Sequence, residues 1–274
     1  MKSAIILSMA INLLAATNQS DARVIWKAAG AVSQGEFPQV VALAYQSGKS
    51  DLKPFCAGYY IGNGLVLTAG HCVDEYDSKV LRVIYNTTDL SKPNRYMANV
   101  ASQHRHPKFR YVDAMSPEGQ YLNPPIYDFG IVVLDRALPI EVTSPPIGQK
   151  ESYYDVESII VGWGQTENAP SSNQLLYAEI PVVSDGQCAS KYLQLPMTSE
   201  ICAGYLGDRS NTCHGDSGGP LLAKAANGEF AQIGVVSFGY ECGPRSAYGV
   251  YSWVGAASEF IQDMNHRYGL DHRH

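Results

Sequence analysis

Short apolar runs, separated by clusters of Gly, Pro, Asn and Asp, dominate the pattern of hydrophobic and polar positions along this chain. Runs of this length between turn-forming residues are typical of β-strands, and their close spacing favours an all-β barrel or sandwich over alternating strands and helices. We expect strands in the following runs: QVVALAY, GYYIGNGLVLTA, KVLRVIY, DFGIVVL, SIIVGWG, LLYAEIPVV, GPLLA, AQIGVVSFG and YGVYSWV.

A helical spacing appears at the C-terminal end, in GAASEFIQDMNHRYG, where Phe260, Ile261 and Met264 fall on one side. Near the middle, the Pro-rich stretch RALPIEVTSPPIGQKES divides the chain. A stretch of this kind is typical of a linker between domains. We therefore expect a β domain over residues 24–139, a linker over 140–152, and a second β domain with the terminal helix over 153–274.

The N-terminal segment has the features of a secretory signal peptide over residues 1–22. Lys2 is followed by a run of apolar residues and then by small ones, with cleavage left open among Ala15, Ala16 and Ala22. No later segment reaches the length of a membrane span. The net charge of −6 argues against nucleic acid or an anionic membrane as the main partner. With 45% apolar residues, the chain can form a sizeable core, and we expect a secreted monomer.

The cysteines of a secreted chain suggest disulfides, and six cysteines can pair in 15 ways. In chain order they fall into three neighbouring couples, and pairing within each couple would close loops of modest size. A zinc site lacks the usual Cys-x-x-Cys pair, and we expect no metal or other cofactor. Asn86-Thr-Thr is an acceptable glycosylation sequon in this compartment. The cysteines are Cys56, Cys72, Cys188, Cys202, Cys213 and Cys242.

The stretch NTCHGDSGGP raises the question of whether Ser217 is a nucleophile. Gly215 to Gly219 fit Gly-x-Ser-x-Gly, the strand-to-helix turn that carries the nucleophile of α/β-hydrolases. Here Cys213 lies four residues before the serine, and Pro220 stops any helix that would follow. The chain order of those enzymes would also force the histidine into the C-terminal tail. We therefore reject this alternative.

A second interpretation takes a base from LTAGHCV and an acid from PPIYDFGIVVL. Asp128 opens a strongly apolar run, where a buried carboxylate needs a partner, and the imidazole of His71 supplies one. His71 would take the proton of Ser217 and later return it to the leaving group. Asp128 would hold the ring in the useful tautomer and stabilise the imidazolium. The backbone N–H groups of Gly215 and Ser217 would form the oxyanion hole.

The motifs LTAGHC, DFGIVVL, VGWG, EICAGY and CHGDSGGP together resemble the trypsin/chymotrypsin-like serine proteases. The resemblance runs from about Gly35 to the end of the C-terminal helix. It implies two six-stranded antiparallel β-barrels with the active site between them, with His71, Asp128 and Ser217 as the catalytic triad, and it supports pairing of the cysteines within each couple. It also implies a secreted endopeptidase acting through an acyl-enzyme, with protein or peptide substrates, an activating protease and protein inhibitors as partners.

In this family the residue two before Cys213 lies at the base of the primary specificity pocket, and here it is Asn211. A neutral Asn forfeits the buried ion pair that an Asp would make with an Arg or Lys side chain of the substrate. The pocket walls match Gly239 and Gly249, which lack side chains, and Asn211 or Thr212 can hydrogen-bond a Tyr hydroxyl. We expect cleavage after Tyr, Phe, Leu or Met. The alternative is a poorly selective enzyme in which Asn211 only fills the pocket.

The resemblance places further residues beside the substrate. Ser237 and Gly239 would pair with the substrate backbone as an added strand, and Phe238 stands where the family usually has Trp. Between HRHP and Asp128 the chain carries roughly ten more residues than family members usually do. This stretch, KFRYVDAMSPEGQYLNPP, would overhang the non-primed side of the cleft and restrict substrates.

The N-terminal pattern departs from the family. Its zymogens are usually cut before Ile-Val-Gly-Gly, and the freed ammonium pairs with the Asp beside the catalytic Ser, here Asp216. This chain reads Arg23-Val24-Ile25 and lacks both glycines, so a cut before Val24 is the best match. Gly70 also stands where Ala is usual. The alternative function is therefore a catalytically silent homologue acting as a secreted binding module, although the complete triad favours the endopeptidase.

Overall fold

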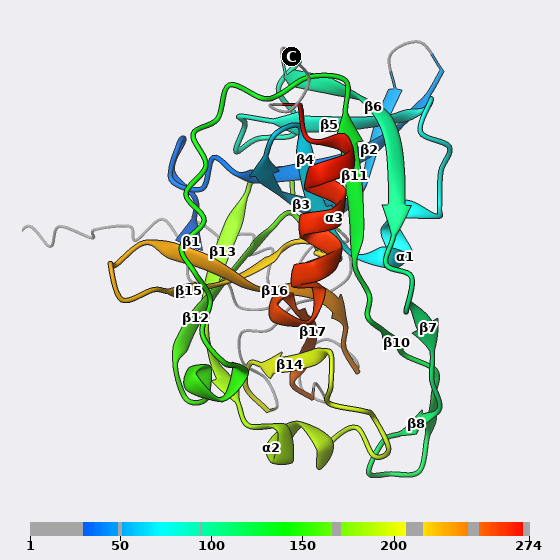
Figure 1. Ribbon diagram of the computed structural model, residues 1–274, viewed down its shortest axis with the longest axis vertical. Coiled ribbons are helices and arrows are strands. Elements are labelled where there is room, and N and C mark those ends of the chain that lie inside the picture. The colour runs from blue at the N-terminus through cyan, green and yellow to red at the C-terminus, as the bar shows by residue number, and fades with distance from the viewer. Residues whose placement is uncertain are drawn as a thin grey trace, which may run out of the picture.

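The computed structural model of the chain describes residues 30–48, 51–93, 95–165, 171–206, 216–240 and 247–270. Six antiparallel strands of the N-terminal half close into a barrel in the order β11-β4-β3-β2-β5-β6, which lies at the top of Figure 1. Their bounds are β2 (Val40–Ser47), β3 (Asp51–Gly62), β4 (Leu65–Thr68), β5 (Leu81–Tyr85), β6 (Tyr96–Arg105) and β11 (Gly130–Leu134).

The C-terminal half forms a second ring of six antiparallel strands, in the order β13-β12-β15-β16-β17-β14, because β14 also pairs with β13. The bounds are β12 (Glu157–Gly162), β13 (Leu176–Val183), β14 (Glu200–Ala203), β15 (Pro220–Lys224), β16 (Phe230–Phe238) and β17 (Gly249–Trp253). The expected fold of two six-stranded antiparallel barrels is confirmed.

The apolar pattern located most strands of the two barrels, but it merged two strands into one run and did not reveal two others. The run GYYIGNGLVLTA is not one strand: Asn63 and Gly64 both have positive φ, 52° and 74°, and turn the chain between β3 and β4. An Asn-Gly pair is typical of such a hairpin turn. The pattern did not reveal β6, since much of that strand is exposed and carries polar side chains. It also did not reveal β14, which is only four residues long.

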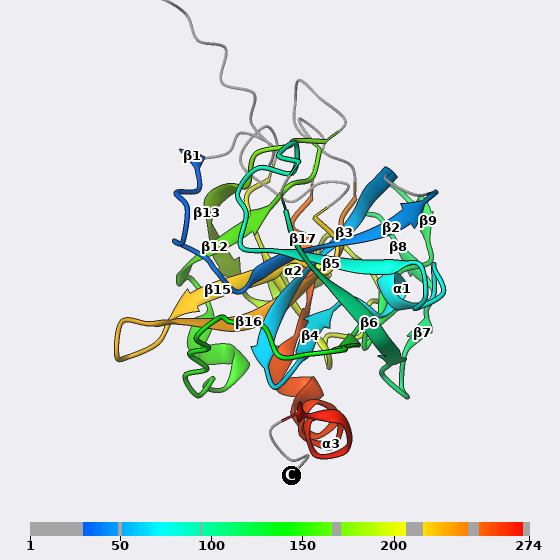
Figure 2. The same ribbon diagram turned by 90° about the horizontal axis from the view of Figure 1, so that it is seen from above.

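Each terminal segment packs against the barrel that is distant in sequence. β1 (Gly30–Ala31) pairs with β13 in the second sheet. The C-terminal helix α3 (Ser258–Tyr268) follows the 3₁₀ turn η2 (Val254–Ala257) and lies on the outside of the molecule in Figure 2. Its buried side chains, Phe260 and Met264, join the core of the first barrel. None of the helices within the described ranges has the length and apolar content to cross a membrane.

Within the described residues, three further short helices lie between the strands. α1 (Gly70–Val73) follows β4, and η1 (Lys150–Tyr153) begins within the last residues of the predicted linker. α2 (Asp185–Ala189) begins at a capping box, in which the Ser184 hydroxyl accepts the Gln187 N–H and the Gln187 side chain accepts the Ser184 N–H. Such reciprocal bonds satisfy two backbone donors that the first turn would otherwise leave unpaired.

The long stretch before Asp128 is folded rather than a plain loop. Its short strands pair as two ladders, β7 with β10 and β8 with β9. Met115 also exchanges backbone hydrogen bonds with Leu193, at 3.0 and 2.8 Å, so the stretch is joined to the second half of the chain. The bounds are β7 (Arg110–Tyr111), β8 (Ala114–Met115), β9 (Tyr121–Leu122) and β10 (Pro125–Ile126).

Two disulfides lie within the described residues. Cys56 is bonded to Cys72 and Cys188 to Cys202, at sequence separations of 16 and 14 residues. Both are pairs of neighbouring cysteines, as expected. The third expected pair, Cys213 with Cys242, lies outside the described residues.

The two barrels approach each other closely at Gly218. Its φ of +81° favours glycine, and a Cβ there would overlap the Thr68 hydroxyl and the Ala57 carbonyl oxygen of the first barrel. The Gly218 N–H donates to the carbonyl of Val236 in β16 at 2.8 Å. Glycine is therefore required here both by its backbone conformation and by the close approach of the other barrel.

Gly218→Ala should lower the free energy of unfolding by more than Gly228→Ala. Gly228 has nearly the same φ, +85°, but a Cβ there would meet nothing within 4 Å. Both variants carry the backbone penalty of alanine at positive φ, while the clash should add roughly 1–3 kcal/mol at Gly218. Denaturant unfolding of the two variants measures the difference, and equal losses would contradict the close approach.

Candidate functional site

A buried carboxylate forms the centre of the site. Asp128 lies two residues before β11, and its side chain is fully buried. Its Oδ1 accepts the backbone N–H of His71 at 2.8 Å, and its Oδ2 lies 2.7 Å from His71 Nδ1. The same Oδ2 accepts the hydroxyl of Ser237 at 2.6 Å. These three donors offset the cost of burying the charge, as expected for a carboxylate at this position.

The contact with Asp128 sets the tautomer of His71. A carboxylate only accepts hydrogen bonds, so Nδ1 must carry the proton and the neutral ring keeps its lone pair on Nε2. Burial lowers the pKa of His71, but the hydrogen bond to Asp128, the charge of Asp128 and the charge of Glu75 outweigh it and raise the pKa above its ordinary value. The ring is therefore an oriented base that is 27% exposed.

Local structure holds His71 in place. It lies in α1, and the adjacent Cys72 is bonded to Cys56 in β3. A Cβ at Gly70 would lie 2.8 Å from the ring of Phe109 and 2.9 Å from the carbonyl oxygen of Phe129. Glycine at this position thus makes room for Phe109, which comes from the long stretch before Asp128.

Contacts of Ser217 and of the preceding Asp216 hold the turn that carries the candidate nucleophile. Its carbonyl oxygen accepts the N–H of Ala57 in β3 at 2.8 Å, which ties this turn to the first barrel. Asp216 is buried, and its Oδ1 accepts the N–H of Gly164 at 2.9 Å. A Cβ at Gly162 or Gly164 would overlap the Asp216 side chain. The glycines of the VGWG motif therefore leave the space that Asp216 fills.

The structure places part of the expected pocket. Phe238 is half-buried and meets the ring of Tyr192 edge-on at 5.5 Å. Gly239 is exposed, with open space where a Cβ would lie, and Gly249 is buried at the start of β17. The other predicted residues of the pocket, oxyanion hole and activation site lie outside the described residues: Asn211, Thr212, Gly215, Arg23 and Val24.

Asn86, the predicted glycosylation site, lies at the surface of the first barrel. Asn86 is exposed after β5, and its side-chain oxygen accepts a hydrogen bond from Gln34 at 3.2 Å.

Within the described residues, the one group of side chains with the spacing of metal ligands is Cys56, His71 and Cys72. Its two sulfur atoms are bonded to each other, so they offer no thiolates for a metal.

Sequence reasoning missed two residues next to the site. Ser199 is fully buried, and its hydroxyl accepts the backbone N–H of Tyr127, the residue before Asp128, at 3.1 Å. Glu200, which is 1% exposed, accepts the Ser199 hydroxyl at 2.5 Å. Glu200 opens the EICAGY motif, so the sequence contained a carboxylate within an apolar run, but only the fold brings it near Asp128.

Comparisons with known proteins agree with this arrangement. The family model described as Trypsin matches residues 29–261. Mannan-binding lectin serine protease 1 of Mus musculus is 29% identical over 244 residues, which is 84% of this chain and 34% of that protein. Trypsin 5G1 of Aedes aegypti is 28% identical over 218 residues, covering 77% of this chain and 75% of the trypsin.

A third relative is phenoloxidase-activating factor 1 of Holotrichia diomphalia, 29% identical over 257 residues that cover 83% of this chain and 66% of that protein. The chain thus spans only about a third of the mouse protease and 66% of the Holotrichia factor. The family model, in contrast, covers most of the described residues and both barrels. The chain belongs to the trypsin family of serine proteases.

Proposed function

We propose that this protein is a secreted serine endopeptidase that hydrolyses peptide bonds through an acyl-enzyme. The observation that carries the proposal is the contact between His71 Nδ1 and the buried Asp128 Oδ2, 2.7 Å long. It leaves Nε2 as the acceptor for a serine proton, and a serine hydroxyl is a weak nucleophile until such a base acts on it.

The proposed reaction uses this chain's residues in turn. His71 takes the proton from Ser217 Oγ as the hydroxyl attacks the substrate carbonyl, and Asp128 stabilises the imidazolium that forms. The backbone N–H groups of Gly215 and Ser217 then hold the developing oxyanion. His71 returns its proton to the leaving amine, and water repeats the sequence to release the acyl group. The mechanism is the template established for this family.

The proposed preference is for Tyr, Phe, Leu or Met before the cleaved bond. It rests on the neutral Asn211 at the base of the pocket and on the absence of side chains at Gly239 and Gly249. The open space at Gly239 supports a pocket that admits a large side chain. The strands β7 to β10 lie between HRHP and Asp128, and we propose that they restrict the non-primed side of the cleft.

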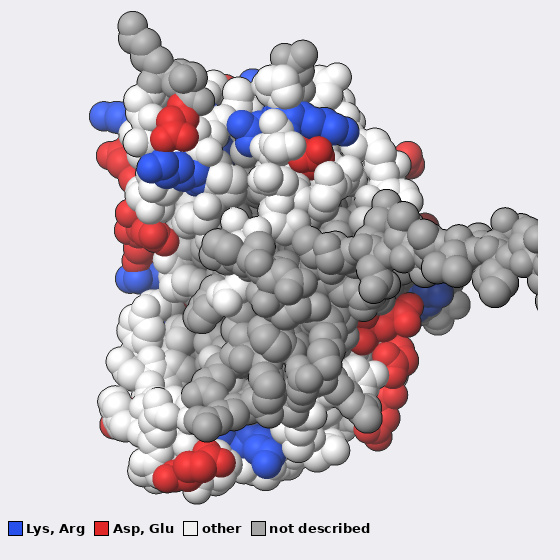
Figure 3. Space-filling model, turned by 180° about the vertical axis from the view of Figure 1, so that it is seen from behind, with Lys and Arg blue, Asp and Glu red and all other residues white. Residues whose placement is uncertain are grey.

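The names of the relatives and the charge of the surface both support protein or peptide substrates. The names of the relatives describe proteases and activators of phenoloxidase. Among the described residues of the face in Figure 3, acidic and basic side chains are mixed at the left and upper edges, acidic ones gather at the lower right, and no continuous basic surface is visible. Such a surface does not favour nucleic acid. We propose that the mature protein acts as an extracellular monomer, with Asn86 glycosylated.

Activation would follow from a cut between Arg23 and Val24. The new ammonium of Val24 is proposed to pair with Asp216, and this ion pair would assemble the oxyanion hole. The burial of Asp216 supports the proposal, because a buried carboxylate favours a cationic partner. An activating protease would be the partner that makes this cut, and protein inhibitors would limit the mature enzyme.

Cleavage rates on peptides that differ only in the residue before the cut test the proposed function. The secreted mature protein, its N-terminus established by sequencing, should cleave after Tyr, Phe, Leu or Met and react at Ser217 with a fluorophosphonate. Ser217→Ala should lose both properties. Asn211→Asp should gain cleavage after Arg and Lys, because it restores a charge to the pocket. A wild-type preference for Arg or Lys would contradict the proposed pocket, and no reaction at Ser217 would favour the silent binding module.

The acid side of the pH–activity profile should move when Glu75 loses its charge. His71 must be neutral to act as a base, so activity rises as the pH passes its pKa. Glu75 raises that pKa, and Glu75→Gln should therefore shift the rise in kcat/KM to lower pH. The shift should shrink in high salt, because Glu75 is exposed. Glu157→Gln, an exposed change on β12, serves as the control, and equal profiles for both variants would contradict the expectation.

A further inference from the structure

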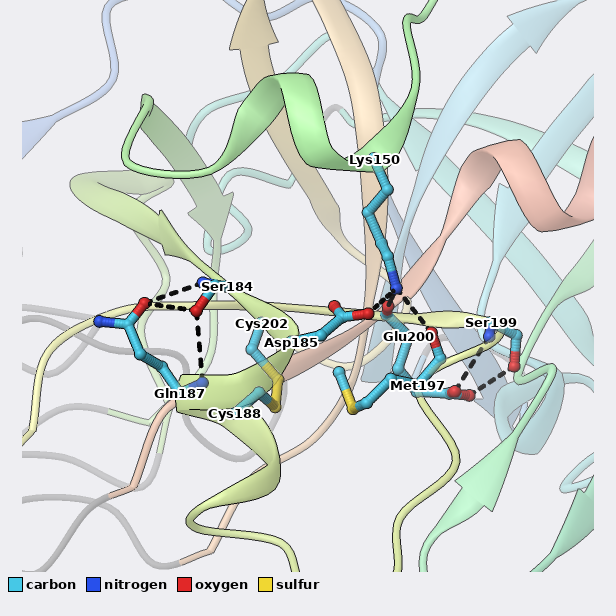
Figure 4. Close-up of polar contacts among 9 residues, drawn as sticks. All are labelled: Lys150, Ser184, Asp185, Gln187, Cys188, Met197, Ser199, Glu200 and Cys202. Carbon is cyan, nitrogen blue, oxygen red and sulfur yellow. Dashed lines mark hydrogen bonds and ion pairs between the residues drawn. A yellow bond between two sulfur atoms is a disulfide. The ribbon is translucent and has the colours of Figure 1, made fainter.

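A buried polar pair lies behind the residue that precedes Asp128. Ser199 and Glu200, at the start of β14, are 0% and 1% exposed. The Ser199 N–H donates to Glu200 Oε2 at 3.1 Å, and its hydroxyl donates to Oε1 at 2.5 Å, as Figure 4 shows. The same hydroxyl oxygen accepts the N–H of Tyr127 at 3.1 Å. The pair therefore connects a carboxylate to the main chain directly before Asp128.

Tyr127 has a backbone conformation that needs such support. Its φ is +50°, an uncommon value for a residue with a side chain, which persists only when its surroundings hold it. Its carbonyl oxygen accepts the N–H of Phe129 at 2.8 Å, so a tight turn encloses Asp128. The bond from Tyr127 N–H to Ser199 anchors the N-terminal side of this turn. Its loss would free Asp128 to rotate away from His71.

A second anchor fixes the pair itself. The Lys150 ammonium donates to Asp185 Oδ2 at 2.7 Å, to the Met197 carbonyl at 2.6 Å and to the Glu200 carbonyl at 3.2 Å. In Figure 4 these contacts meet at the Lys150 ammonium, beside Glu200. Lys150 thus holds the main chain of Glu200, while the carboxylate is left to bind Ser199. Neither Lys150 nor Asp185 contacts Tyr127 through the bonds that the described residues show.

We propose that Ser199 and Glu200 are positioning residues for catalysis: through the N–H of Tyr127 they hold Asp128 in the orientation that binds His71. This inference rests on the proposed function, because it concerns the same site. A serine hydroxyl can accept one bond and donate another at once. Donation to a carboxylate is charge-assisted and makes the hydroxyl oxygen a better acceptor for Tyr127.

Through the Ser199–Glu200 pair, the geometry of the site also depends on whether Glu200 is ionised. Burial raises the pKa of Glu200 to about 7, although its bonds to Ser199 and Tyr127 and the charge of Lys150 lower it. Lys150 and Asp185 are the charged groups beside Glu200. At Tyr127, the His106 ring stacks on the Tyr127 ring at 5.2 Å, and Lys108 Nζ lies 5.4 Å from the centre of the same ring. Ionised Glu200 accepts both Ser199 bonds, and protonation turns one acceptor into a donor. The acid side of the kcat/KM profile should therefore contain two ionisations, those of His71 and Glu200.

Two variants of the full secreted chain test the proposal. Ser199→Ala removes the acceptor for Tyr127 and should lower kcat roughly tenfold to a hundredfold with KM little changed. Glu200→Gln keeps the shape but cannot ionise, so its kcat/KM profile should retain only the ionisation of His71. Fluorophosphonate titration of Ser217 counts active enzyme in every sample, and thermal melting reports folding.

Matched controls separate positioning from stability. Ser158→Ala removes another fully buried serine, whose hydroxyl donates to the Ile180 carbonyl at 2.6 Å. Glu157→Gln neutralises an exposed carboxylate on β12, outside this network. Both controls should keep the wild-type kcat and the two ionisations, even if they melt at lower temperature.

NMR titration of the His71 ring gives a readout that needs no turnover. Ser199→Ala should lower the pKa of His71, because a displaced Asp128 stabilises the imidazolium less, while Ser158→Ala should leave it unchanged. The positioning role is overturned if the His71 titration in Ser199→Ala and the pH profile of Glu200→Gln both match the wild type. If Ser217 does not react with the fluorophosphonate, the proposed function fails, and the His71 titration alone still decides the positioning role.

Discussion

The carboxylate of Asp128, buried where the two barrels meet, is the constraint on which the site depends. Its donors come from both sides: His71 belongs to α1, beside the first barrel, and Ser237 to β16 of the second. A buried charge is tolerated only when such partners are complete, so correct docking of the barrels and correct orientation of His71 are one requirement. Any change that separates the barrels should also disturb the candidate base.

Glycines let the turn that carries Ser217 pack closely against neighbouring strands. Gly218 admits the Thr68 hydroxyl and the Ala57 carbonyl, and the glycines of VGWG admit Asp216. These contacts join segments of the chain that are far apart in sequence. The glycine-rich motifs around Ser217 are thus explained by the space that the neighbouring strands require, in addition to any direct role in chemistry.

Two features hold the segment that carries Asp128. The stretch before Asp128 forms its own short strands and is bonded to the second half through Met115 and Leu193. The Tyr240 hydroxyl also donates to Gln120 of this stretch at 2.7 Å. On its other side, the turn at Asp128 is bonded to Ser199, with Glu200 behind it. The segment that carries Asp128 is therefore held from the second barrel at several points, which is consistent with a preorganised acid.

The sequence alone predicted an all-β fold, because buried strands such as β11 appear as unbroken apolar runs. The two barrels were implied by the resemblance of its motifs to the family. It also indicated His71, Asp128 and Ser217, since short motifs surround each of them. It did not reveal β6, whose exposed face carries polar residues, or the packing of α3 on the first barrel. The roles of Ser199 and Glu200 were decided by tertiary structure. Their contacts with Tyr127 join residues 72 positions apart, and no local pattern encodes a bond that only barrel closure creates.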